Sequence, residues 1–153
     1  MTLQCFFGNL FIDLIRGRIL SKFDVEKTVN YWYEGAQYDL DVAEAMEEKR
    51  KYPYALFMGH LALEKLLKAL VVKTTQQHAP YTHSLPLLAE KSGIKIPKRT
   101  TKRLARFMEF HFEARYPDEQ KKFYKKCTKV FATKKMKEIR EVYEWLKKKL
   151  EKK

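Results

Sequence analysis

The sequence predicts an all-α protein, built as an up-and-down bundle of four to five helices. Its 153 residues suit one domain with a hydrophobic core of its own. Five glycines and five prolines are too few for the many turns of an all-β fold. From Asp24 onward, apolar residues recur at spacings of three and four, which gives each helix one buried face.

Residues 1–22 are expected to form an N-terminal extension or appended helix ahead of a helical domain at residues 23–153. Their apolar run, from Cys5 to Ile15, is interrupted by polar residues and is too short to span a bilayer. Their arginines follow that run, whereas a signal peptide has its basic residues first. We therefore expect no membrane segment and a cytoplasmic location.

Two long helices are expected first. The earlier one covers residues 21–52, with Ser21 or Asp24 as its cap, and its apolar residues share one face. Pro53 suits the first turn of the next helix, which runs to Thr75 and is apolar around much of its circumference. A helix of that kind lies at the centre of a bundle, so its few polar residues stand out.

Three further segments complete the predicted bundle. Ser84 can cap, and Gly93 can end, a short helix. A third long helix covers residues 98–115, and Pro117 stops it. In the last segment, residues 118–153, an amphipathic helix is expected, and its apolar positions form one stripe: Val130, Met136, Ile139, Val142, Tyr143, Leu146 and Leu150.

The net charge of +13 is concentrated near the C-terminus. Residues 121–153 hold 14 Lys or Arg against 4 Glu, and so carry +10 of that charge. Such a segment suits a polyanion, either a nucleic acid or an acidic protein surface. A solvated helix face rich in Lys and Glu has the same composition, so the charge alone leaves these alternatives open.

The two cysteines, Cys5 and Cys127, lie far apart and match neither a zinc motif nor a disulfide framework. This pattern agrees with a reducing compartment. The sequence has no Gly-rich dinucleotide loop, no P-loop and no G-x-S-x-G nucleophile motif. We therefore expect no bound metal and no cofactor.

Three polar residues of the expected core helix share one face. His60, Glu64 and Lys68 follow one another at intervals of four, and His83 in the following loop could approach them. One explanation is a hydrogen-bonded polar stripe that lines a cleft, anchors the loop or forms a subunit contact. A metal site is the other, but the pattern lacks a ligand motif such as H-E-x-x-H.

The stretch RFMEFHFEARYPDE, residues 106–119, holds the residues best suited to catalysis. Arg106 and His111 lie about 140° apart around a helix, whereas His111 and Arg115 share a face. Imidazole can move a proton near neutral pH, and an arginine fork can hold a phosphate in a transition state. This is the minimum for metal-independent RNA cleavage, although a histidine near a helix end is also a common structural feature. The neighbouring aromatic residues can stack RNA bases or fill a core.

Four pieces of the sequence occur in a characteristic order: YEGAQYDLDVAEAM, YPYALFMGHLALEKLLKALV, YTHSL and EARYPDE. Their order resembles that of the HEPN domain family, small helical proteins of bacteria and archaea. The combination of Glu-Lys-x-x-Lys-Ala at residues 64–69, Thr-His at residues 82–83 and Arg-Tyr-Pro-Asp at residues 115–118 is its most specific part. The resemblance covers about residues 24–149, nearly the whole chain apart from the extension.

The resemblance implies a HEPN-like bundle that forms a homodimer, often encoded beside a minimal nucleotidyltransferase as a toxin–antitoxin or defence pair. Many members are metal-independent endoribonucleases with an Arg-x4-6-His motif in a cleft between two protomers. Arg106 and His111 match that motif, so Arg106 would orient or stabilise phosphate and His111 would move the proton. Arg115 and Tyr116 would contact the substrate. The alternative is a non-catalytic module that binds a nucleotide or the nucleotidyltransferase partner.

Overall fold

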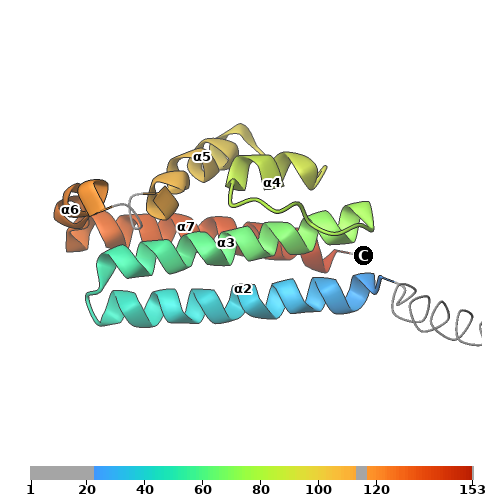
Figure 1. Cartoon of the computed structure of the whole chain (residues 1–153), viewed down its shortest axis with the longest axis horizontal. Coiled ribbons are helices and arrows are strands. Elements are labelled where there is room, and N and C mark those ends of the chain that lie inside the picture. Colours follow the sequence, from blue (N-terminus) through green and yellow to red (C-terminus); the bar gives the residue numbers. More distant parts are fainter. Residues whose placement is uncertain (1–22, 113–116, 153) are drawn as a thin grey trace, which may run out of the picture.

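The computed structural model describes residues 23–112 and 117–152, and the ordered elements in this part of the chain are all helices. The predicted all-α class is therefore confirmed. Three long helices form the body of the fold: α2 (Val25–Glu48), α3 (Tyr52–Thr75) and α7 (Lys129–Glu151). Helix α3 packs against both others, and α2 runs in the opposite direction to α3 and α7 (Figure 1).

Three shorter helices complete the described part. Helices α4 (Leu85–Lys91) and α5 (Lys98–Phe112) pack on α3 and on each other. Helix α6 (Pro117–Lys126) lies at the end of the bundle where α7 begins (Figure 1). The chain thus runs one way in α2, back in α3, returns through α4 and α5, and runs back again in α7, the up-and-down order that the sequence predicts.

Several predicted caps are present. The Asp24 carboxylate accepts the backbone N–H of Lys27 at 2.9 Å and begins α2. The Ser84 hydroxyl oxygen accepts the backbone N–H of Leu87 at 3.3 Å and begins α4. Gly93 follows α4 with a φ of +64°, a left-handed conformation that glycine adopts without steric cost.

The last segment departs from the prediction of one helix over residues 118–153. The Thr128 hydroxyl oxygen accepts the backbone N–H of Phe131 at 3.3 Å, so a new helix begins at Lys129 and α6 precedes it. Val130 falls in the first turn of α7 and is 80% exposed, so its place in the apolar stripe was predicted wrongly. The other residues of that stripe are buried.

Helix α3 is the central core helix, as predicted, and most of its residues are buried. Gly59 allows it to approach α7 closely, because a Cβ added there would lie 2.8 Å from Cδ1 of Ile139. Three polar residues, His60, Glu64 and Lys68, are buried in this helix as well. No helix within the described residues is long and apolar enough to cross a membrane.

Some sequence predictions fall on residues that the structure does not describe. The proposed extension at residues 1–22, with the candidate cap Ser21, lies outside the described residues. The same holds for the candidate substrate residues Arg115 and Tyr116 and for the predicted end of the third long helix beyond Phe112.

Candidate functional site

Glu64 is the centre of a polar cluster that is buried in α3. Its Oε1 accepts a hydrogen bond from Nζ of Lys68, one helical turn later, at 2.8 Å. Its two oxygens each lie 3.1 Å from Nδ1 of His83, in the loop before α4. Burial disfavours the charged carboxylate, but Lys68 and His83 outweigh burial and hold the pKa of Glu64 below its ordinary value. Glu64 is therefore an ionised carboxylate in a largely apolar helix.

His60 lies one turn before Glu64 and is fully buried. Its Nδ1 lies 3.1 Å from the carbonyl oxygen of Phe107 in α5, and only a protonated Nδ1 can donate to a carbonyl. Burial lowers the pKa of His60 to about 4, so the ring is neutral near neutral pH. Its Nε2 is then an unprotonated acceptor, and this nitrogen lies 3.7 Å from Oε2 of Glu64.

His111, at the end of α5, also belongs to the cluster. Its ring centroid lies 5.0 Å from that of His60 and 4.7 Å from that of His83, with a tilt of 26° to the latter. Three of the four histidines of the chain therefore gather beside Glu64. The fourth, His78, instead contacts the ring of Phe23, with centroids 4.0 Å apart and the rings tilted by 46°.

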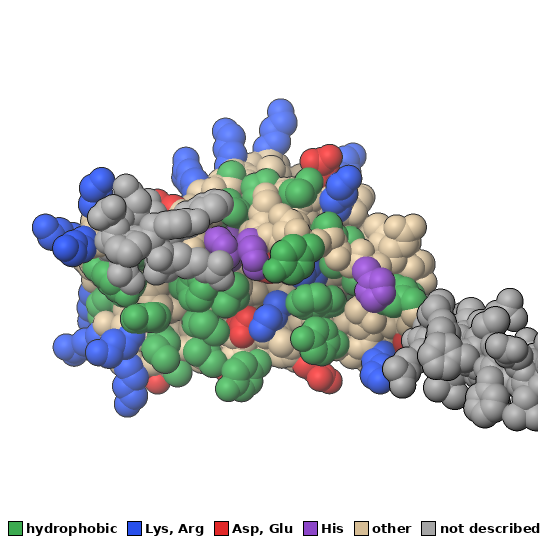
Figure 2. All heavy atoms as spheres, in the orientation of Figure 1, with side chains coloured by type: hydrophobic (Ala, Val, Ile, Leu, Met, Phe, Trp, Pro, Cys, Tyr) green, Lys and Arg blue, Asp and Glu red, His purple; other side chains and the backbone are tan. Residues whose placement is uncertain are grey.

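The three histidines differ in their exposure to solvent. His111 is 4% exposed and His60 is fully buried, whereas the side chain of His83 is 42% exposed. His83 is thus the imidazole that a dissolved ligand can reach directly. Figure 2 shows histidine side chains at the surface of one face of the molecule, with hydrophobic side chains around them.

Helix α2 supplies a residue of the cluster that the sequence did not indicate. Nζ of Lys68 lies 4.8 Å above the ring of Trp32, a cation–π contact that holds the ammonium group next to Glu64. Trp32 also lines a surface hollow with Tyr31, Tyr38 and other residues. In the sequence, Trp32 is one of many apolar positions of its helix, and no local signal relates it to Lys68.

Arg106 does not join the cluster. It is exposed on α5 and lines a second hollow, together with Lys98, Arg99, Lys102, Arg103 and Glu138. His111 instead faces α3, as expected for two positions that lie about 140° apart on one helix. The structure therefore places the two residues of the Arg-x4-His motif on different faces of α5.

Helix α5 carries a basic row, defined here as Lys98, Arg99, Lys102 and Arg106, and all four residues are exposed. Three of them are spaced by four residues, so they follow one line along the helix. That spacing is visible in the sequence, but the larger charge excess lies near the C-terminus. Lys and Arg side chains project along the edge of the molecule formed by α4 and α5 (Figure 2).

The arrangement at Glu64 is suited to proton transfer. Nδ1 of His83 donates to a carboxylate, which fixes the tautomer of the ring and leaves Nε2 as a base. A carboxylate in this position also stabilises the imidazolium that forms when the base takes a proton.

Comparison with known proteins gives one family. The sequence profile of the HEPN domain matches residues 29–150. No curated protein matches the chain. Among solved structures, the fold is similar to that of the crystal structure of TT1696 from Thermus thermophilus, with a TM-score of 0.68 and 19% identity over 79% of this chain and 97% of that one. At this identity, the likeness to that structure concerns the fold alone.

Proposed function

The chain belongs to the HEPN domain family, and on that basis we propose that it binds single-stranded RNA and cleaves it, without a metal ion, at the cluster around Glu64. The observation that carries the proposal is the pair formed by His83 and Glu64. An imidazole that is 42% exposed is held at 3.1 Å by a carboxylate that is 6% exposed. The pair thus offers an oriented base at the surface.

In the proposed reaction, Nε2 of His83 takes the proton of a 2′-hydroxyl group. The 2′-oxygen then attacks the adjacent phosphorus, the bond to the 5′-oxygen breaks, and water gives the departing oxygen a proton. The hydroxide that remains takes the proton from His83, which restores the neutral imidazole. The products are a 2′,3′-cyclic phosphate and a 5′-hydroxyl end. Glu64 stabilises the imidazolium form of His83 in the transition state.

Phosphate binding is assigned to the basic row of α5. Its exposed side chains lie on the same helix as His111, which stacks on His83. Arg106 then binds the RNA backbone and not the phosphate at the cleavage site, because it lies outside the cluster. An exposed row of cations binds a polynucleotide mainly through its backbone, so little base preference is expected.

His111 takes a supporting role in this proposal. The family motif implies that it moves the proton, but it is 4% exposed and packed between two other rings. We assign proton transfer to His83 and the positioning of His83 to His111. Replacing His111 should therefore slow cleavage less than replacing His83.

The test is cleavage of a single-stranded RNA by the full chain in EDTA. We expect cleavage by the wild-type protein and at least a roughly 10²-fold loss in His83→Gln, the size of a general-base contribution. His78→Gln is the matched control, because His78 is an exposed histidine outside the cluster. Equal cleavage by His83→Gln and the wild type would refute the assignment.

We place the homodimer contact on the aromatic face of α2. Tyr31 and Tyr38 are 68% and 69% exposed and lie two turns apart on one side of the helix. Aromatic side chains are enriched at protein interfaces. Replacing both tyrosines by serine should convert a dimer to folded monomers in analytical ultracentrifugation, and an unchanged mass would contradict this placement.

We also propose that the partner of a toxin–antitoxin or defence pair binds to the basic row. A minimal nucleotidyltransferase with an acidic surface would cover the row and compete with RNA. The expected result is that such a partner lowers RNA affinity, and that charge reversal at Lys102 weakens both complexes. A partner that binds without affecting RNA affinity would instead favour the non-catalytic role, in which the cluster binds a nucleotide.

A further inference from the structure

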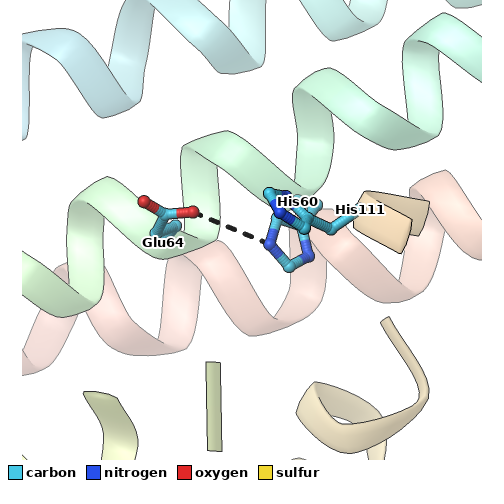
Figure 3. A group of neighbouring side chains, drawn as sticks. All are labelled: His60, Glu64 and His111. Atoms are coloured by element: carbon cyan, nitrogen blue, oxygen red, sulfur yellow. Dashed lines mark ion pairs between the residues drawn. The ribbon is translucent and has the colours of Figure 1, made fainter. Parts of the chain in front are cut away.

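The geometry points to a binding site for a divalent transition metal, of the Zn²⁺ or Co²⁺ type, formed by His60, Glu64 and His111. One ligand atom from each residue lies within 4.8 Å of the other two, and all three residues are buried. Figure 3 shows His60 and Glu64 on α3, with His111 from the end of α5 beside them. The sequence spacing raised a metal site at His60 and Glu64 as one alternative, but it gave no sign of His111, which is far from them in the chain.

His60 is already arranged as a metal ligand. Its Nδ1 donates to the carbonyl oxygen of Phe107, the kind of contact that orients metal-bound imidazoles in proteins. Its Nε2 therefore points its lone pair into the cluster, although this buried nitrogen has no hydrogen-bond partner among the described residues. A buried polar atom without a hydrogen-bond partner destabilises the fold, and a metal ion would bind the lone pair of this nitrogen.

Glu64 has an oxygen to offer to a metal. Its Oε1 holds Lys68 at 2.8 Å, while its Oε2 lies 3.7 Å from Nε2 of His60. Metal bonds of about 2.0–2.1 Å in a tetrahedron separate neighbouring ligand atoms by roughly 3.3 Å. His60 and Glu64 are thus near the required separation, and the third ligand atom must close in by up to about 1.5 Å.

The ligand set selects the class of ion. Two imidazoles and one carboxylate suit Zn²⁺ and similar ions, whereas Mg²⁺ and Ca²⁺ prefer oxygen ligands alone. Three protein ligands leave a fourth position, which water or the nearby His83 can take. The positive charge of Lys68 opposes a cation here, so we expect tight binding only for ions that bind imidazole strongly.

The site shares Glu64 with the proposed catalytic pair, but it does not rest on that function. An ion bound to Oε2 would draw the carboxylate away from Nδ1 of His83, which now lies 3.1 Å from both oxygens. If the protein cleaves RNA as proposed, Zn²⁺ should inhibit the cleavage. Binding itself is measured without RNA, so failure of one proposal is distinguishable from failure of the other.

The experiment is a titration of the full chain with Co²⁺, after dialysis against a chelator, followed by visible absorption. We expect saturation at one equivalent per chain with the intense bands of a tetrahedral site, and displacement of Co²⁺ by Zn²⁺. The bands should be lost in His111→Gln and kept in His78→Gln, which removes the histidine outside the cluster. Circular dichroism shows whether each variant is folded.

Two results would overturn the inference. One is a wild-type protein that gives no Co²⁺ bands and whose thermal unfolding is unmoved by Zn²⁺. The other is a folded His111→Gln variant that binds Co²⁺ as the wild type does. Because the first result concerns the unmodified chain, the test stands even if the variant does not fold.

Discussion

His83 and Glu64 are 19 positions apart in the chain, and Nδ1 of the imidazole lies 3.1 Å from both carboxylate oxygens. The loop between α3 and α4 brings the two together. On one side, the pair is tied into the core through Lys68; on the other, it reaches solvent through the imidazole. The proposed cleavage depends on that arrangement, and its energetic consequences can be measured independently of any activity.

Loss of the Glu64 charge should destabilise the fold. In Glu64→Gln, the ammonium of Lys68 stays buried without its counter-ion, and breaking such a pair on one side costs about 3 kcal/mol. The double variant with Lys68→Met should recover part of the loss, because no charge is then left buried. Urea unfolding gives the free energy of unfolding of the single and the double variant. A double variant less stable than Glu64→Gln would contradict the pairing.

Acid should weaken the fold through His60. In the folded protein the pKa of His60 is about 4, below the ordinary value of 6.5. Between pH 6.5 and pH 4, His60 is therefore protonated in the unfolded chain but not in the folded protein. The contribution of His60 to the free energy of unfolding is fully present above the ordinary pKa of 6.5. It decreases as the pH falls toward the folded pKa of about 4. Between about pH 7.5 and about pH 5, we expect a loss of roughly 2 kcal/mol from this group.

The measurement is urea unfolding in EDTA at the two pH values, for the wild type and for His60→Gln. The variant should lose less stability on acidification than the wild type, because its side chain does not titrate. An equal loss in the two proteins would show that His60 is not the group responsible.

Crowding at Gly59 should be unfavourable. A Cβ there would already lie 2.8 Å from Ile139, so the larger side chain of Gly59→Val forces α3 and α7 apart. Overpacking of this kind costs about 1–3 kcal/mol. Gly35→Ala is the milder comparison, since the nearest atoms belong to the flexible side chain of Lys65. The midpoint of thermal unfolding of Gly59→Val should be well below that of Gly35→Ala. The reverse order would refute close packing at Gly59.

RNA binding should depend on salt through the basic row. Each phosphate contact of a single strand contributes about 0.7 to the slope of log affinity against log salt. Arg106→Ala should therefore weaken binding and lower that slope by about 0.7. Lys27→Ala, an exposed lysine on α2, is the control and should leave the slope unchanged. Equal slopes in all three proteins would place the RNA elsewhere.

Much of the fold could be predicted from local signals. Asp24, Ser84 and Gly93 act through hydrogen bonds or backbone conformations of their own neighbourhood, so the sequence alone identified them. The break at Thr128 was missed, and Val130, which lies in the first turn after it, was wrongly included in the apolar stripe.

The site was only partly predictable, for a different reason. Helical spacing puts His60, Glu64 and Lys68 on one face, because that relation is local. The position of His111 depends on how α5 crosses α3, and a single sequence does not report that crossing. The burial of His111 and the exposure of Arg106 are therefore structural findings, and they favour His83 as the base over His111.

The most direct test of the account is the single-turnover cleavage rate of four proteins in EDTA: the wild type, His83→Gln, Glu64→Gln and the double variant. If the two residues act as one unit, the double variant is no slower than the slower single variant, because the second change removes nothing further. Rates that fall in the double variant by the product of the single losses, in proteins shown to be folded, would contradict that unit.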